Sequence, residues 1–242
     1  MILLFTDYGA ADIYSGQLRA ALCALAPGSE IVDLLHTAPN YNIKASAHLL
    51  AALVPQFQIA STCLAIVDPG VGSQRDAVVM LADRKWYVGP DNGLLSVLAA
   101  RASKVELWRI TWRPENLSRS FHGRDLFAPI AALIEKGAFP YDKLAAMARL
   151  GLVLDAGDLA EIIYIDHYGN AMTGLRAGVL QHGDKLLLGS VELSYAPVFS
   201  QAQSMQPFWY ENCIGLIEIA LDRGDAAALL DIKVGDLLRR SL

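Results

Sequence analysis

Three residue types suited to acid–base chemistry stand beside glycine-rich turns in this chain. Asp68 follows an apolar run and precedes a Pro-Gly turn, and Arg75 comes seven residues later. His122 precedes Gly123. An aspartate can accept a proton or orient a nucleophile, a histidine can do either near neutral pH, and an arginine can hold the acid or stabilise negative charge. These residues predict water activation or oriented polar binding.

Other polar turns follow predicted strands. They are Thr6-Asp7-Tyr8-Gly9 and Pro90-Asp91-Asn92-Gly93. A single aspartate after a strand is weak evidence, because aspartate is also an ordinary turn and helix-cap residue. Ligands of open α/β sheets bind beyond the carboxyl ends of the strands. The joint pattern of several such turns therefore favours a site at that edge.

Strand and helix patterns alternate in the first half of the chain, and the polar turns follow the predicted strands. Apolar residues recur at helical spacing at Leu18, Leu22 and Leu25, and Pro27 ends that helix. The predicted order is strand 2–5, helix to 25, strand 30–34, helix 43–54 and strand 63–67. This βαβαβ order predicts a mostly parallel sheet with right-handed crossovers.

Further strands and helices are expected before Asp155, after which the sequence shows little helical periodicity. Residues 77–82 and 85–88 read as a hairpin around Asp83-Arg84, a helix begins near Leu94, and another spans 127–134 with Pro129 in its first turn. After Asp155, strand patterns separated by Gly, Asp and Asn predict a small antiparallel sheet or barrel; they are 161–165, 185–188 and 215–220. We therefore expect an α/β domain over residues 1–154 and a β-rich domain over 155–242.

Composition narrows the class of protein. Hydrophobic residues make up 54% of the 242 residues, yet no apolar run approaches the ~18 residues of a membrane span. The apolar start of the chain meets Asp7 too soon for a signal peptide, and the three cysteines have no CxxC spacing. A net charge of −5 argues against a broad nucleic-acid surface. We expect a cytoplasmic protein with a small-molecule substrate and no nucleic-acid or membrane partner.

The sequence resembles the S-adenosyl-L-methionine (SAM) hydroxide adenosyltransferases, which are related to the bacterial fluorinase and chlorinase. The stretches that carry the resemblance span nearly the whole chain in the family's order. They are Thr6–Gly9 with Asp12, Val67–Gly72 with Arg75, Gly89–Gly93, Phe121–Pro129, Asp166 with Tyr168-Gly169-Asn170, and Asn212 with Gly215 and Glu218.

The resemblance implies hydrolysis of SAM by water at ribose C5′, giving adenosine and methionine. The family's catalytic triad matches Asp68, Arg75 and His122, and no metal or cofactor is implied. The related halogenases carry a tyrosine and a serine beside their halide, where this chain has Asp68 and Gly123. An acid next to a halide would repel it, so water is the expected nucleophile.

The resemblance also implies substrate-binding residues and a homotrimer with sites at subunit interfaces. Asp7 would hold the ribose hydroxyls, Asp12 and Asp166 the methionine ammonium, and Asn170 the adenine. The remaining matches are Tyr41 and Tyr168 in the pocket wall, and Asn212 with Cys213 before the pocket. For both tyrosines, core packing is the alternative reading. Position 214 departs from the family pattern, because Ile214 offers no cation to the methionine carboxylate.

Two other functions fit the sequence. Clustered carboxylates after parallel strands also suit Mg²⁺, so a metal-dependent nucleotidase could use Asp7, Asp12, Asp91 and Asp125 as ligands. A binding protein for SAM or adenosine with little turnover is the third possibility, which the missing cation at position 214 favours. A chelator separates the first alternative from the hydrolase, and a product assay separates the second.

Overall fold

In the computed structural model, residues 1–57 and 61–240 are described, and the chain divides into two compact units. The first unit comprises residues 1–51 and 57–156, and the second comprises residues 52–56 together with the chain from residue 157 onward. Among the described residues, no helix is both long enough and apolar enough to cross a membrane. Each unit is an α/β or β-rich domain of the predicted kind.

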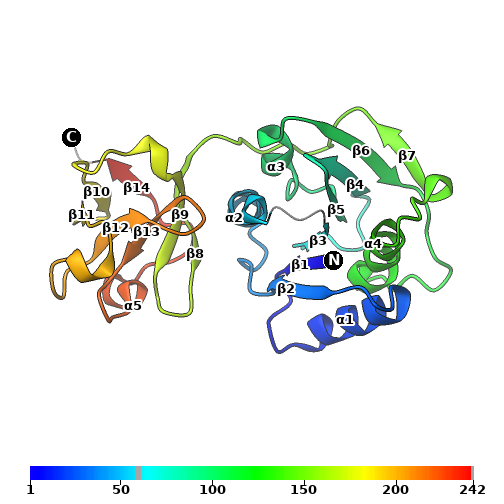
Figure 1. The fold of residues 1–242 in the computed structure, drawn as a ribbon, viewed down its shortest axis with the longest axis horizontal. Coiled ribbons are helices and arrows are strands. Elements are labelled where there is room, and N and C mark those ends of the chain that lie inside the picture. The colour runs from blue at the N-terminus through cyan, green and yellow to red at the C-terminus, as the bar shows by residue number, and fades with distance from the viewer. Residues whose placement is uncertain (58–60, 241–242) are drawn as a thin grey trace. The chain divides into compact units, whose positions relative to one another are not determined.

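A mixed sheet of seven strands forms the centre of the first unit (Figure 1). Its strand order is β2-β1-β3-β5-β4-β6-β7. The strands are β1 (Ile2–Thr6), β2 (Ile31–Leu35), β3 (Thr62–Ile66), β4 (Ala77–Ala82), β5 (Lys85–Pro90), β6 (Val105–Ile110) and β7 (Leu144–Met147). The pairs β1–β2, β1–β3 and β3–β5 are parallel, and the remaining pairs are antiparallel. The predicted parallel part is confirmed, and the antiparallel extension adds to it.

Register brings the ends of β1 and β3 together. Thr6 pairs with Ile66 at the carboxyl end of the two parallel strands. The next residues along each strand are Asp7 and, two positions past Ile66, Asp68. The sheet therefore places these two carboxylates at one edge, which is where the sequence predicts the site.

The hairpin between β4 and β5 lies where the sequence predicts it. Asp83 and Arg84, the two central residues of the turn, both have positive φ, 44° and 69°. This is the signature of a type I′ turn, whose twist matches that of the flanking strands. At the far end of β5, Gly89 passes close to β3, because a Cβ there would lie 2.2 Å from the Ala65 carbonyl oxygen. Glycine at position 89 therefore lets β5 pair closely with β3.

Helices cover both faces of this sheet (Figure 1). They are α1 (Ile13–Leu25), α2 (Ile43–Leu53), α3 (Ser96–Arg101) and α4 (Ala128–Glu135). α1 and α4 pack against one face and share a buried core with β1 and β3 that includes Leu18, Leu22 and Ile130. α4 is preceded by a π-helical turn, Gly123–Phe127, and Pro129 lies in its first turn as predicted.

The second unit is a seven-stranded sheet that nearly closes into a barrel. Its order is β14-β10-β11-β12-β13-β9-β8. The strands are β8 (Leu159–Ile165), β9 (Ala171–Arg176), β10 (Leu186–Leu188), β11 (Val191–Tyr195), β12 (Phe208–Glu211), β13 (Leu216–Ala220) and β14 (Leu238–Arg240). Backbone bonds from Ile162 N to the Asp236 oxygen (2.9 Å) and from Gly235 N to the Ile162 oxygen (2.8 Å) join its two edges. A short helix, α5 (Ala226–Leu230), was not expected from the sequence.

Candidate active site

The turn after β3 folds the chain back on itself. Val71 N donates to the Asp68 carbonyl oxygen at 3.2 Å, and Ser73 N donates to the Gly70 carbonyl oxygen at 3.0 Å. Gly72 has φ +80°, and a Cβ there would lie 2.6 Å from the Arg119 carbonyl oxygen. Consecutive turns, one of which needs glycine, thus return Arg75 to the carboxylate that begins the loop.

Asp68 and Arg75 form a bidentate pair. Arg75 Nε donates to Asp68 Oδ1 at 2.7 Å, and Arg75 Nη2 donates to Asp68 Oδ2. Their side chains are only 5% and 9% exposed, respectively, so this is no surface ion pair. The guanidinium also lies over the Phe127 ring, 5.3 Å from its centroid. A fork of this kind fixes the carboxylate in one orientation.

His122 completes the cluster from the turn that precedes the π-helical segment. Its Nδ1 lies 3.2 Å from Arg75 Nη2. Burial, and then the Arg75 charge, lower the pKa of His122 below its ordinary value of 6.5. Because a guanidinium only donates, we assign Nδ1 as the acceptor and place the proton of the neutral ring on Nε2. The structure thus brings together the three residues predicted to activate water.

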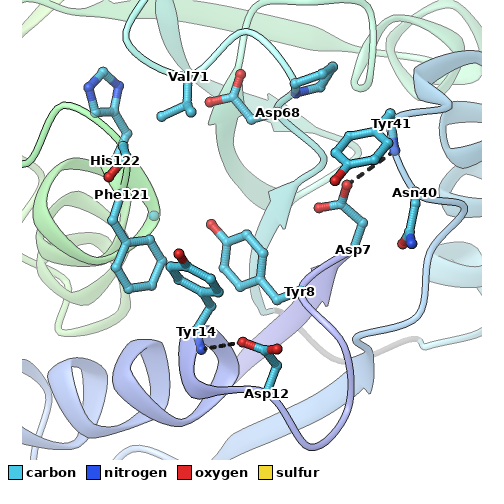
Figure 2. A pocket seen from close by; sticks show the side chains of 13 residues that line it. Asp7, Tyr8, Asp12, Tyr14, Asn40, Tyr41, Asp68, Val71, Phe121 and His122 are labelled. Carbon is cyan, nitrogen blue, oxygen red and sulfur yellow. Dashed lines mark hydrogen bonds between the residues drawn. The ribbon is translucent and has the colours of Figure 1, made fainter.

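Asp68 and His122 border a cavity of about 280 Å³ in the first unit, which we call the N-domain pocket (Figure 2). Its lining residues are Asp7, Tyr8, Asp12, Tyr14, Asn40, Tyr41, Asp68, Pro69, Val71, Ser120, Phe121, His122 and Gly123. They come from the ends of β1 and β3, the start of α1, and the loops before α2 and α4. Arg75 stands behind Asp68 and is not part of the wall.

Three predicted substrate-binding residues lie in this pocket. Asp7 Oδ2 accepts from Tyr41 N at 3.3 Å, and burial raises the pKa of the Asp7 carboxyl against the effect of that hydrogen bond. Asp12 caps α1, since its Oδ1 accepts from Tyr14 N at 3.2 Å, so it serves as a helix cap as well as a pocket residue. Tyr41 is 76% exposed.

The second unit holds a larger cavity of about 720 Å³, the C-domain pocket. Its lining residues are Asp166, Tyr168, Asn170, Met172, Phe199, Tyr210, Asn212, Cys213, Glu218, Leu221, Arg223 and Gly224. Every predicted substrate-binding residue of the second half is among them. Tyr168 is 74% exposed. The core-packing alternative for Tyr41 and Tyr168 is therefore wrong, and both rings are available to a ligand.

Asp166 and Asn170 are tied to each other in the turn between β8 and β9. Asp166 Oδ1 accepts from the backbone N of Tyr168 and of Asn170, both at 2.9 Å, and its Oδ2 accepts from Asn170 Nδ2 at 2.9 Å. One of the two Nδ2 hydrogens of Asn170 is thereby used, which orients the amide and leaves its Oδ1 and the second Nδ2 hydrogen for a ligand.

A buried acid organises the other wall of the C-domain pocket. Glu218, which is 2% exposed, accepts from Asn212 Nδ2 at 2.8 Å and from the Tyr210 hydroxyl. Burial raises the pKa of Glu218. Asn212 Oδ1 in turn accepts from Ile214 N at 3.1 Å and Leu216 N at 3.0 Å, so the Ile214 amide is already bonded within the turn.

Several pocket residues were missed by the sequence reasoning. In the N-domain pocket they include Tyr8 and Phe121, which stand inside the motifs quoted for the resemblance but were given no role. In the C-domain pocket, Arg223 is the one cation among the described lining residues. It has positive φ, 51°, in the tight turn after β13, and nothing in the sequence pattern marks it.

The carboxylates of the nucleotidase alternative do not gather at one point. Asp125 accepts a bidentate pair from Arg124 at 2.6 and 3.0 Å, and Asp91 accepts from Gly151 N at 2.7 Å. Of the four, Asp7 and Asp12 alone share the N-domain pocket. Within residues 1–57 and 61–240, no group of three or more His, Cys, Asp or Glu side chains is placed to hold a metal ion.

Comparisons with known proteins cover nearly the whole chain. Residues 2–145 match the family model of the SAM hydroxide adenosyltransferase N-terminal domain, and residues 160–239 match that of the C-terminal domain. The (R)-S-adenosyl-L-methionine hydrolase of Thermus thermophilus is 35% identical over 253 residues, which cover 97% of this chain and 96% of that protein. The protein of the same name from Salinispora arenicola is 34% identical over 248 residues, 97% and 95% of the two chains.

A solved structure is similar to this chain over its whole length. The crystal structure of an uncharacterized conserved protein from Thermotoga maritima superposes with a TM-score of 0.89 at 28% sequence identity, covering 100% of both chains. The match thus extends over both pockets.

Proposed function

Because the chain belongs to the family of SAM hydroxide adenosyltransferases, we propose that it hydrolyses SAM at ribose C5′ to adenosine and L-methionine. The observation that supports this most directly is the Asp68–Arg75–His122 cluster at the wall of the N-domain pocket. The two hydrolases that this chain resembles are named for the (R) form of SAM, and we extend that form to this chain.

In the proposed reaction, a water oxygen attacks C5′ while the C5′–S bond breaks. The electron pair of that bond goes to sulfur, which leaves as the neutral thioether of methionine. Asp68 accepts a proton from the water and later releases it to solvent, while Arg75 holds the carboxylate in place. A hydroxide-like nucleophile meeting a sulfonium neutralises charge, so a partly dry site favours the transition state over the separated, hydrated ions.

The binding roles follow the two pockets. Asp7 would accept the ribose hydroxyls, since its second oxygen is not used by Tyr41. Asp12 and Asp166 would face the methionine ammonium, Asn170 Oδ1 would read the adenine, and Tyr41 and Tyr168 would flank the ligand. Asn212 and Cys213 would form the wall next to the amino acid, and Arg223 would supply the charge that Ile214 lacks.

We also propose a homotrimer in which a neighbouring subunit completes each site. The support is chemical: water-activating groups line the N-domain pocket, whereas the acceptor proposed for adenine lines the C-domain pocket. Free cysteines at positions 23, 63 and 213 are compatible with the proposed cytoplasmic location.

An isotope experiment tests the reaction. Purified protein is incubated with SAM in H₂¹⁸O, with and without a chelator, and the products are analysed by mass spectrometry. We expect adenosine carrying one ¹⁸O at the 5′ position and unlabelled methionine, at the same rate in both samples. Loss of activity with chelator that Mg²⁺ restores would favour the nucleotidase. Bound SAM without any product over prolonged incubation would favour a binding protein.

A further inference from the structure

Tyr8 projects its hydroxyl into the N-domain pocket (Figure 2). Its ring packs edge-on against Phe121, with ring centroids 5.7 Å apart, and at a tilt against Tyr14, 6.0 Å away. Its backbone N donates to Thr6 Oγ1 at 3.2 Å, which fixes the start of the loop after β1. The phenol is thus held in place by its ring, while its oxygen faces the cavity.

The position of this oxygen is defined by Gly123. A Cβ built on Gly123 would lie 2.3 Å from Tyr8 Oη, so the phenol oxygen occupies the space that any side chain at position 123 would need. Gly123 directly follows His122, and both line the pocket together with Asp68. The hydroxyl is therefore beside the water-activating cluster.

The groups around Tyr8 Oη differ in whether they can still donate or accept a hydrogen bond. Asp68 offers only acceptors when ionised, and the Arg75 donors are directed to Asp68, to His122 and to the Asp76 carbonyl oxygen. Among the described residues, no protein group forms a hydrogen bond with Tyr8 Oη. Burial, and then the charges of Asp68 and Asp7, raise the pKa of Tyr8, so the phenol keeps its proton. Tyr8 is thus a neutral donor with no acceptor in the described part of the chain.

We propose that Tyr8 is a further catalytic residue, whose hydroxyl donates a hydrogen bond to the oxygen of the attacking water. This inference rests on the proposed hydrolysis. Asp68 takes one proton of the water, and the Tyr8 hydroxyl binds one lone pair, which leaves the other lone pair directed at C5′. The C5′–O bond forms, the C5′–S bond breaks with its electrons on sulfur, and Tyr8 retains its proton throughout.

The first test is Tyr8→Phe, which removes one oxygen and keeps the ring contacts. We expect kcat to fall about 10-fold, the scale of one neutral hydrogen bond, with KM for SAM changed less than about two-fold. Tyr87→Phe is the matched control, because it removes the hydroxyl of a buried tyrosine in β5 outside the pocket. That variant should keep the wild-type kcat and KM.

A second variant tests the position of the oxygen. Gly123→Ala would force Tyr8 Oη away from its place, because the new methyl group would lie 2.3 Å from it. In the Tyr8→Phe background that oxygen is gone, and the methyl group would meet carbons of Ile66 and Phe121 at 3.3 Å. We therefore expect Gly123→Ala to lower kcat in the wild type and to cause little further loss of kcat in the Tyr8→Phe background. The effects of the two substitutions on kcat would then not be additive in a double-mutant cycle.

The possible outcomes separate this inference from the proposed function. If the wild type forms no adenosine, the hydrolase assignment itself fails. If the wild type is active and Tyr8→Phe retains its kcat, or changes KM alone, Tyr8 does not bind the attacking water. Additive losses in the cycle would also overturn the proposal, and thermal melts of all variants establish that each is folded.

Discussion

Asp68 has no freedom to turn toward substrate without breaking a bidentate pair, because the Arg75 fork binds both of its oxygens. Each carboxylate oxygen keeps a second lone-pair direction, and one of these is where the water proton would go. Orientation, more than proximity alone, is therefore what Arg75 contributes. An ammonium at position 75 could not reproduce the fork.

Asp68→Asn is predicted to lower kcat about 100-fold or more, because the amide keeps the shape of the side chain but cannot take the water proton. KM should change little, since the lost interaction belongs to the transition state. Steady-state adenosine formation measures both constants. Asp142→Asn, in an exposed pair with Lys143, is the control and should behave as wild type. An intact kcat with weakened SAM binding would make Asp68 a binding residue.

A pH prediction follows from His122, whose pKa is lowered by burial and by Arg75. The neutral ring that accepts from Arg75 persists below pH 6.5, so kcat should stay level through 6.5 and fall only in more acidic solution. Folding favours the neutral ring, so its contribution to stability is present above pH 6.5 and is lost as the pH falls below that value. A pH–rate profile and melts at each pH check this, and an acid limb centred above the ordinary histidine pKa would contradict it.

Residue identities at the site were largely predictable, whereas their bonding was not. Asp68, Arg75 and His122 differ in type and lie apart in the sequence, and they were grouped by their chemistry beside glycine-rich turns and by the family resemblance. Asp12 is both a helix cap and a pocket residue, and the Ile214 amide is bonded within its own turn. Both features depend on backbone geometry that residue types do not encode. Tyr8 was quoted within its turn but given no role, because the residue type does not show that its hydroxyl faces a cavity.

At the scale of elements, Asn92 connects the end of β5 to the turn that carries Asp68. Its Nδ2 donates to the Val67 carbonyl oxygen at 2.8 Å, and its Oδ1 accepts from Leu94 N at 3.2 Å. Val67 lies between the end of β3 and Asp68, and Asn92 follows β5, which pairs with β3. The asparagine side chain therefore fixes the backbone just before Asp68.

Asn92→Ala is predicted to destabilise the protein by about 1–3 kcal/mol, because it leaves the buried Val67 carbonyl without this partner. It should also lower kcat more than it raises KM, since the Asp68 turn loses its support. Denaturant melts and steady-state kinetics measure the two effects. Asn116→Ala, in a loop outside both pockets, is the control. Reduced stability with unchanged kcat would show that the turn is held by its other contacts alone.

The elements themselves were predicted unevenly, for physical reasons. The hairpin at Asp83-Arg84 was predicted because two charged residues separate two strand-like runs, and it is confirmed. β7 was missed, since Leu144–Met147 has no β-branched or aromatic residue and is defined by its pairing with β6. The π-helical turn at Gly123–Phe127 has no sequence signature, although it positions His122.

For the whole molecule, the proposed trimer predicts that two inactive variants can restore each other. Asp68→Asn inactivates the N-domain pocket, and Asn170→Ala impairs the C-domain pocket. Co-expressed in equal amounts, they should give about a quarter of the wild-type rate, because about one site in four would combine two intact halves. Sedimentation measures the assembly state in parallel. A rate equal to the mean of the two separate variants, or a fully active monomer, would contradict shared sites.

The joined edges of the second unit have a consequence for biosynthesis. β8 pairs with β9 along one edge, and its other edge is bonded by residues 235–237, which a ribosome adds after every other strand of that sheet except β14. Until then, one edge of β8 is open and able to pair with other chains. The sheet of the first unit, in contrast, is complete once β7 has emerged. During translation the half proposed to activate water can therefore fold early, whereas the half proposed to hold adenine is exposed to misassembly for longest.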